Sequence, residues 1–259
     1  MLDTVQYLLG ALSGALVGFS LGLVGGGGSI LAVPLMVYLV GVKSPHVAIG
    51  TSALAVAANA FMSLLNHARA GNVRWRCGLM YAAAGVLGAF GGSTAGKAFD
   101  GQRLLFLFAI VMIVVGALML RRRRHAGTVG AQCDRTNAKK VLGYGLGTGA
   151  FSGFFGIGGG FLIVPGLVAS TDMAMINAVG TSLIAVTAFG LTTALNYAGS
   201  GLVEWLLAGT FIGGGALGSW LGAQAAKRLS GAGQLTTIFA GLIFVVAAYM
   251  LWKSAAQAF

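Results

Sequence analysis

Long runs of apolar residues, separated by short polar stretches, fill the chain from end to end. Residues 104–120 read LLFLFAIVMIVVGALML, so every face of a helix formed by them would be apolar. A strand of a membrane β-barrel would instead alternate apolar and polar residues, so this pattern excludes a barrel and indicates helices. A helix that crosses a bilayer needs about 20 apolar residues. About eight hydrophobic windows of this kind occur, at residues 5–40, 46–66, 76–98, 103–120, 142–170, 175–197, 204–226 and 235–252.

The first and the fifth windows are too long for one crossing. A single helix over 5–40 would measure about 54 Å at 1.5 Å per residue, whereas the hydrocarbon core is about 30 Å thick. Each window contains a glycine run followed by a proline: GLVGGGGSILAVP at 22–34 and GFFGIGGGFLIVP at 153–165. We predict a helix, a glycine turn and a second helix in each, with Pro34 and Pro165 as hinge or helix-break positions.

The same two strings show that the chain is a tandem repeat. The glycines and the proline of the first string recur 131 positions later, and GTS at 50–52 recurs 130 positions later at 180–182. The match at this second offset continues through the Asn, Gly, Val and Trp that follow. We divide the chain into a first transmembrane repeat (1–120), a basic linker loop (121–140) and a second transmembrane repeat (141–259). Duplication of this kind is typical of transporters.

Composition and charge place the chain in a membrane. Hydrophobic residues make up 57% of it and charged residues 8%, against about 25% charged in soluble domains. The net charge of +11 comes from bases in short loops, which indicates membrane orientation rather than nucleic-acid binding. The bases divide 12 to 4 between the two sides if the halves are inverted, and 11 to 5 with eight plain crossings. Glu204 stands where the first half has Arg74, so we favour inverted repeats, with the linker cytoplasmic and both termini outside.

The glycine runs are the first candidates for substrate contact. Glycine costs about 1 kcal/mol relative to alanine in a helix, and it bares backbone that lipid cannot satisfy. Broken helices in a membrane expose N–H groups that attract an anion. Close helix packing is the alternative, and it accounts for glycines such as Gly85 and Gly88. The candidate residues in these runs are Gly25, Gly26, Gly27, Gly28 and Ser29 in the first half, and Gly156, Gly158, Gly159 and Gly160 in the second.

Uncharged polar side chains follow each glycine run. The candidates are Thr51, Ser52 and Asn59 in the first half, and Thr181 and Ser182 in the second. Hydroxyls and amides suit a small anion, although hydrogen bonding between helices is the alternative for each residue. We expect His67 to be a solvated residue at a helix end rather than a proton carrier, and Lys97 to reach the membrane interface rather than the substrate. Cys77 and Cys133 are expected to be free thiols.

Several classes of chemistry have no matching residues. The five acidic residues fall at or near segment ends, so no carboxylate stands in the middle of the membrane to bind a cation. The chain has no HExxH, GxSxG or Walker motif and no metal-binding spacing of histidine and cysteine. We therefore expect no enzyme activity, no metal and no cofactor.

The ordered motifs together resemble one known family. Each half opens with GxxGxGG(S/G)xxxxP and continues with GTS, a segment ending in Asn and a G-x-V-x-W loop. This pattern is similar to the TauE/SafE sulfite exporter family over essentially the whole chain. The resemblance implies a multi-pass permease of a prokaryotic inner membrane for sulfur oxyanions or small organosulfonates. The motifs of the family map onto residues 25–34, 50–52, 156–165 and 180–182.

The sequence thus predicts an all-α polytopic membrane protein that exports a small anion by alternating access. Its partners would be the lipid bilayer and a small anionic substrate. Two alternatives stay open: a permease for another small solute, and a non-transport membrane scaffold. Nothing in the sequence determines the coupling ion or the oligomeric state.

Overall fold

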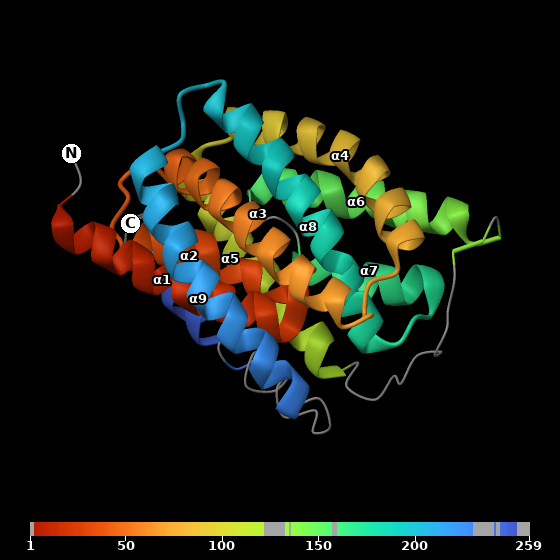
Figure 1. The fold of residues 1–259 in the computed structure, drawn as a ribbon. Coiled ribbons are helices and arrows are strands. Elements are labelled where there is room, and N and C mark those ends of the chain that lie inside the picture. The colour runs from red at the N-terminus through yellow and green to blue at the C-terminus, as the bar shows by residue number, and fades with distance from the viewer. Residues whose placement is uncertain are drawn as a thin grey trace.

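The computed structural model describes residues 3–121, 133–134, 136–156, 160–229, 241 and 244–252. Figure 1 shows an arrangement of helices joined by short loops. In chain order they are α1 (Thr4–Val24), the 3-10 segment η1 (Gly25–Leu31), α2 (Ala32–Pro34), the π-helical segment η2 (Leu35–Leu39), α3 (Pro45–Arg69), α4 (Trp75–Ala98), α5 (Gly101–Arg121), α6 (Ala138–Phe155), α7 (Gly160–Thr171), α8 (Met175–Ala198) and α9 (Trp205–Leu229). Of the last expected window, 235–252, the structure describes residue 241 and residues 244–252.

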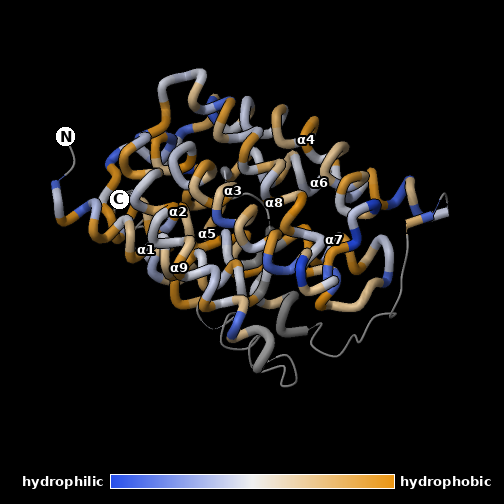
Figure 2. Tube along the Cα trace, in the orientation of Figure 1, coloured by the Kyte–Doolittle hydropathy of each residue, from blue (hydrophilic) through white to orange (hydrophobic). Residues whose placement is uncertain are grey.

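The helices have the length and surface of a membrane protein. Four of those described, α1, α3, α8 and α9, are long and apolar enough to cross a bilayer. Large apolar side chains such as Leu87, Leu217 and Trp220 are exposed on the outside, and apolar residues predominate along the tube in Figure 2. Such a surface is stable against lipid and not against water. The prediction of an all-α polytopic membrane protein is confirmed.

The first glycine unit is a hairpin whose two ends meet. α1 ends at Val24, and the chain then returns through η1, α2 and η2. The Nε2 atom of Gln6, in the first turn of α1, donates to the carbonyl oxygen of Val40 at 2.9 Å. The unit therefore enters and leaves on one side of the bundle.

The prolines do not make the breaks, which corrects the expectation for Pro34 and Pro165. α1 is broken at Gly25, well before Pro34, and Pro165 lies inside α7 without ending it. Pro34 is followed by the π-helical turn of η2. A proline lacks an N–H donor, so it removes one helical hydrogen bond, whereas the change of chain direction needs the left-handed backbone of glycine.

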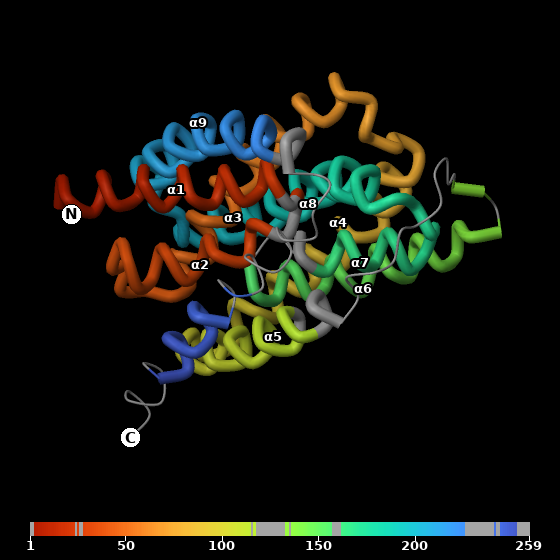
Figure 3. Tube along the Cα trace, turned by 90° about the horizontal axis from the view of Figure 1, so that it is seen from below, coloured from red at the N-terminus to blue at the C-terminus, as the bar shows by residue number. Residues whose placement is uncertain are grey.

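Two closely packed helix pairs form the flanks of the molecule. Figure 3 shows α1 beside α9 on one flank and α4 beside α6 on the other. Glycines allow the backbones to touch: a Cβ atom on Gly18 would collide with the carbonyl of Gly215, and one on Gly149 would collide with the carbonyl of Gly85. These are equivalent contacts in the two halves, and they are the small-residue packing that membrane helices use in place of a hydrophobic driving force.

An antiparallel pair, α3 and α8, lies between the flanks. Thr51, in the second turn of α3, accepts a hydrogen bond from the backbone N–H of Glu204, which follows α8. Thr181, its equivalent in α8, accepts one from the backbone N–H of Arg74, which follows α3. The contacts are reciprocal, as expected when two similar halves are related by a two-fold axis.

These contacts define two ends of the bundle. At the first, which we call the N-terminal end, lie Gln6, Val40 and Glu204. At the second, which we call the linker end, Arg74 lies near the first turns of α8, and Cys77 is joined to Cys133 of the linker. The positions of the candidate site residues are described below relative to these two ends.

Candidate functional site: the predicted substrate-binding residues

The two glycine breaks are built alike but lie apart. Gly25 (φ +69°) ends α1 and packs against Val179 near the beginning of α8. Gly156 (φ +68°) ends α6 and packs against Ile49 near the beginning of α3. Because α3 and α8 are antiparallel, the breaks lie toward opposite ends of that pair. The two breaks themselves therefore do not lie at one common centre.

The segments that follow the breaks do meet. η1 and the residues of α7 are in contact with each other, so the two halves join through their predicted substrate-binding segments. Gly26 and Gly27 lie in η1, Gly28 packs on the backbone of α1 at Ser20, and Ser29 is buried. Gly160 is the first residue of α7. Gly158 and Gly159 lie outside the described residues.

The hydroxyls of the two GTS motifs are buried and engaged with the protein. Thr51 and Thr181 bind the loops described above, while Ser52 and Ser182 donate to the carbonyl oxygens of Ile49 and Val179, three residues earlier in their own helices. These bonds agree with the alternative given above, in which the hydroxyls of the motif hydrogen-bond within the protein rather than to a substrate. A hydroxyl that accepts one bond still has a hydrogen to donate, so a contact between Thr51 or Thr181 and substrate stays a prediction.

Asn59 occupies a different environment. It is fully buried, its amide lies over Gly215 of α9, and neither amide atom has a hydrogen-bond partner in the structure. Buried polar atoms are nearly always paired in proteins. An unpaired amide in the interior is therefore the observation most suggestive of a ligand or water among the predicted residues.

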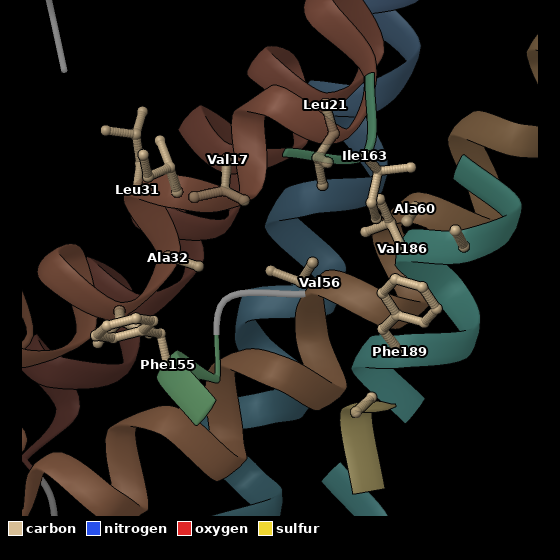
Figure 4. Close-up of a cluster of buried hydrophobic side chains, with 14 of the residues drawn as sticks. Val17, Leu21, Leu31, Ala32, Val56, Ala60, Phe155, Ile163, Val186 and Phe189 are labelled. Atoms are coloured by element: carbon tan, nitrogen blue, oxygen red, sulfur yellow. The ribbon is translucent and has the colours of Figure 1, made fainter. Parts of the chain in front are cut away.

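Apolar side chains fill the middle of the molecule in this conformation. Figure 4 shows Leu21 of α1, Ile163 of α7 and Val186 of α8 gathered near Val56 of α3. A groove of about 490 Å³ lies elsewhere, along α6 from Lys140 to Phe151, with Leu162 of α7 at its side. Movement of solute between the halves would require these apolar contacts to open.

An arginine at the linker end was missed as a site residue by sequence reasoning. Arg74 is half-buried beside the first turns of α8. With the Asn177 amide oriented so that its oxygen faces the guanidinium, this oxygen accepts from Arg74 Nε at 2.8 Å and from Nη2 at 2.9 Å. Amide orientation is assigned from such networks. The signal in the sequence was the contrast between Arg74 and Glu204, which we used only for topology.

The position of Arg74 is not explained by helix stability. A helix N-terminus carries a partial positive charge, so a cation there is unfavourable, and Asn177 offers it only a neutral dipole. Within the described residues Arg74 has no carboxylate in an ion pair. Thr181 and the Gly25 contact at Val179 belong to the same turns of α8. A positive group with unused N–H donors therefore lies at the linker end, against the first turns of α8.

Two other charged residues have structural positions. Lys97 Nζ donates to the backbone oxygen and the Oδ1 of Asn196, at 3.1 and 2.9 Å, and to Ser200 Oγ at 2.9 Å, and so fastens α4 to the C-terminal end of α8. His67 is not solvated, which corrects the expectation: it is 5% exposed, and its Nε2 lies 3.4 Å from the carbonyl oxygen of Gly22. The last carbonyls of a helix lack intrahelical partners, so His67 stabilises the end of α1 before the break.

The cysteines are paired, which corrects the expectation of free thiols. Cys77, near the beginning of α4, and Cys133 form a disulfide with Cα atoms 5.3 Å apart. Two cysteines 56 residues apart gave no signal in the sequence, because only the fold brings the linker back to α4. Among the residues the structure describes, no group of histidine, cysteine and carboxylate side chains could hold a metal ion.

Comparison with known proteins identifies the family. The family model described as "Sulfite exporter TauE/SafE" matches residues 10–250. The chain belongs to the TauE/SafE family. A "Probable membrane transporter protein" of Xylella fastidiosa is 52% identical over 97% of each chain. "Probable membrane transporter protein YdhB" of Bacillus subtilis is 26% identical over 89% of this chain and 96% of its own.

No solved structure matches this TauE/SafE protein. The family and its relatives are membrane transporters by description, which supports the same general role for this chain. The TauE/SafE motifs at 25–34 and 156–165 hold the two breaks, and those at 50–52 and 180–182 hold the reciprocal threonines.

Proposed function

We propose that this TauE/SafE protein exports a small oxyanion by alternating access, with sulfite or a related sulfur oxyanion or organosulfonate as the substrate class. The family description and the names of the relatives support a transporter. With the cell interior negative, moving one negative charge outward gains about 2.3 kcal/mol per 100 mV. Export of an anion therefore does not require a carboxylate inside the membrane to carry a coupling ion.

The guanidinium of Arg74 is the observation that carries the proposal. It is held in a fixed orientation by Asn177, one turn before Thr181 on α8. Arginine presents a planar fork that binds carboxylate, phosphate and similar oxyanions through two parallel hydrogen bonds. The equivalent position at the opposite end is Glu204, which is exposed. Anions are attracted at one end and repelled at the other, so Arg74 marks the end where substrate enters.

The distribution of charge assigns a compartment to each end in this proposal. Arg69, Arg74 and Arg76 lie at the linker end, and the linker adds its own bases, whereas Lys43 and Lys97 lie at the N-terminal end. Basic loops remain in the cytoplasm. The linker end is then cytoplasmic, the halves are inverted repeats, and substrate passes from Arg74 toward the end marked by Glu204.

The proposed binding region lies where η1 and α7 meet. η1 begins at the Gly25 break and α7 begins at Gly160, and the first N–H groups of a helix lack intrahelical partners, so they can bind an anion. The candidates Gly26, Gly27 and Ser29 lie in η1. Thr51, Ser52, Thr181 and Ser182 lie on the two helices that carry the contacts of these breaks. Because apolar side chains fill the middle in this conformation, binding and release require the two halves to move relative to each other.

Counterflow in proteoliposomes tests the proposal. Purified protein is reconstituted with sulfite, a small organosulfonate, a carboxylate or a neutral isostere inside, and uptake of labelled sulfite is measured. We expect uptake with the sulfur oxyanions, little with the carboxylate and none with the neutral compound. A preference for the neutral solute would favour the permease for another solute, and no counterflow with any of them would favour the scaffold.

A further inference from the structure

A row of polar side chains runs along α3 on the side that faces α1 and α9. Asn59, Ser63 and His67 are spaced one helical turn apart, so they share one face of the helix. Asn59 lies over Gly215 of α9, and Ser219 follows one turn later on α9. We call Asn59, Ser63, His67 and Ser219 the α3 seam.

Three members of the α3 seam, Asn59, Ser63 and Ser219, are buried without hydrogen-bond partners among the described residues. Asn59 and Ser63 have no exposed surface and Ser219 is 1% exposed. Neither amide atom of Asn59 has a hydrogen-bond partner, and neither do the hydroxyls of Ser63 and Ser219. Lipid cannot supply such partners, and membrane proteins keep buried polar groups where they face one another, a cavity or a substrate. Four unpaired atoms on two facing helices indicate a place for something polar between them.

The α3 seam leads from the linker end to the middle of the molecule. At one end of it His67 lies beside Gly22, three residues before the break at Gly25. At its other end Asn59 follows Ala57, which packs against Gly190 halfway along α8. The seam is therefore continuous with the end where Arg74 is held.

The equivalent face of α8 differs at the residues that matter. There Phe189, Thr193 and Tyr197 take the places of Asn59, Ser63 and His67. The Phe189 ring stacks on Tyr81 with centroids 6.5 Å apart, and it lies on Gly85. The hydroxyls of Thr193 and Tyr197 are also buried without partners, but an aromatic ring blocks the way to the middle.

We propose that the α3 seam is a binding path for a small oxyanion between the linker end and the middle of the protein, and that Phe189 closes the equivalent path along α8. The inference rests on the proposed function for its ligand class. Amide and hydroxyl groups donate hydrogen bonds to anion oxygens without a fixed countercharge. They bind an anion weakly enough to release it, which a buried arginine would not do.

Cysteine accessibility tests the path independently of sulfite transport. In a Cys77→Ala/Cys133→Ala background, Ser63→Cys is treated with a small sulfonate-bearing methanethiosulfonate in membrane vesicles. Ala57→Cys is the matched control, because Ala57 is also buried on the same helix but lies on a different face, where it packs against Gly190 of α8. An anion can reach a buried cysteine only by a polar route, so we expect Ser63→Cys to react at least about tenfold faster than Ala57→Cys.

Two further measurements make the result specific. Millimolar methanesulfonate, a small organosulfonate that does not react with the reagent, should slow the reaction of Ser63→Cys, and a trimethylammonium reagent of similar size should react more slowly than the sulfonate. Phe189→Asn, which places the first-half residue in the second half, should accelerate the reaction of Thr193→Cys. Because these variants report accessibility from the intact membrane, they do not depend on a working transport cycle.

The outcomes separate this inference from the proposed function. Equal rates for Ser63→Cys and Ala57→Cys would overturn the path even if sulfite counterflow is observed. Fast anionic labelling of Ser63→Cys with no counterflow of any anion would support the path and overturn the exporter. If the two test variants in the Cys77→Ala/Cys133→Ala background each fail to reach the membrane, the two introduced cysteines are compared with the native Cys77–Cys133 disulfide in place. This comparison is valid because cysteines in a disulfide do not react with the reagent.

Discussion

At the scale of single residues, the polar groups fall into two kinds. Thr51 and Thr181 bind neighbouring loops, and Lys97 binds the end of α8, so these groups hold helices together. Arg74 and Asn59 differ, because one has unused donors and the other has no partner at all. Residues whose hydrogen-bonding groups are used within the protein are structural, and residues with unused groups are candidates for substrate contact. The residue type alone does not make this distinction.

Replacing Arg74 with glutamine should weaken substrate binding. A hydrogen bond to a charged group contributes about 1.5–3 kcal/mol, so the apparent affinity for sulfite should fall by about tenfold to a hundredfold. Arg76→Gln is the control, because Arg76 is exposed two positions further along. Initial efflux rates against sulfite concentration at matched expression measure both. Equal affinity in the two variants would remove Arg74 from the site.

Changes at Ser52 distinguish lost bonding from added charge. Ser52 is buried and donates to Ile49, so Ser52→Ala should cost about 0.5–1.5 kcal/mol, the net value of one hydrogen bond, and should only weaken transport. Ser52→Asp should block anion flux, because an uncompensated carboxylate repels the substrate and occupies donors meant for it. Efflux by Ser52→Asp equal to that by Ser52→Ala would place the anion site elsewhere.

At the scale of elements, the glycines serve two purposes that the sequence does not distinguish. Gly25 and Gly156 have positive φ angles and turn the chain, while the glycines of α4 and α9 let backbones touch. Gly85 illustrates the difference, since a methyl group there would collide with the ring of Phe189. A methyl group at Gly85 is therefore accommodated only if the Phe189 ring moves.

Gly156→Ala should disrupt the second break. Its left-handed backbone disfavours a side chain by about 1–2 kcal/mol, and the new methyl group would collide with Ile49. We expect lower thermal stability in detergent and loss of transport by the protein that reaches the membrane. Gly213→Ala, where a Cβ atom meets open space, should change neither. Wild-type transport by Gly156→Ala would show that the break does not require glycine.

At the scale of the whole molecule, two reciprocal contacts connect the halves. The Thr51 and Thr181 bonds join each half to the loop of the other, and the two flanking pairs repeat the same glycine contacts. A rearrangement that opens one end can therefore be mirrored at the other, as alternating access between similar halves requires.

Single exposed cysteines test the orientation of the two ends. In the Cys77→Ala/Cys133→Ala background, an impermeant maleimide on intact cells should label Lys43→Cys and leave Arg69→Cys unlabelled until the membrane is opened. Cys133 itself is a poor reporter, because it is buried in the disulfide. The opposite labelling would reverse the proposed direction of transport.

The sequence by itself determined the class and the plan of this protein. Uninterrupted apolar runs require helices in lipid, because backbone polar groups must be satisfied within each segment. The glycine runs and the GTS motifs, found twice in order, gave the repeats, the hairpin at 5–40 and the family. These properties depend on neighbouring residues or on a repeat along the chain, so the linear sequence is enough to recognise them.

Only the tertiary structure decided which groups meet. The breaks lie toward opposite ends of α3 and α8, His67 is buried against α1, and Cys77 reaches Cys133, because helices that are distant in sequence cross at particular levels. Asn59, Ser63 and Ser219 are visible in the sequence. That their side chains lack hydrogen-bond partners is visible only in the structure, because it depends on which groups α1 and α9 place beside them. Hydrogen-bond partners across helices are set by packing geometry, which no spacing along the chain specifies.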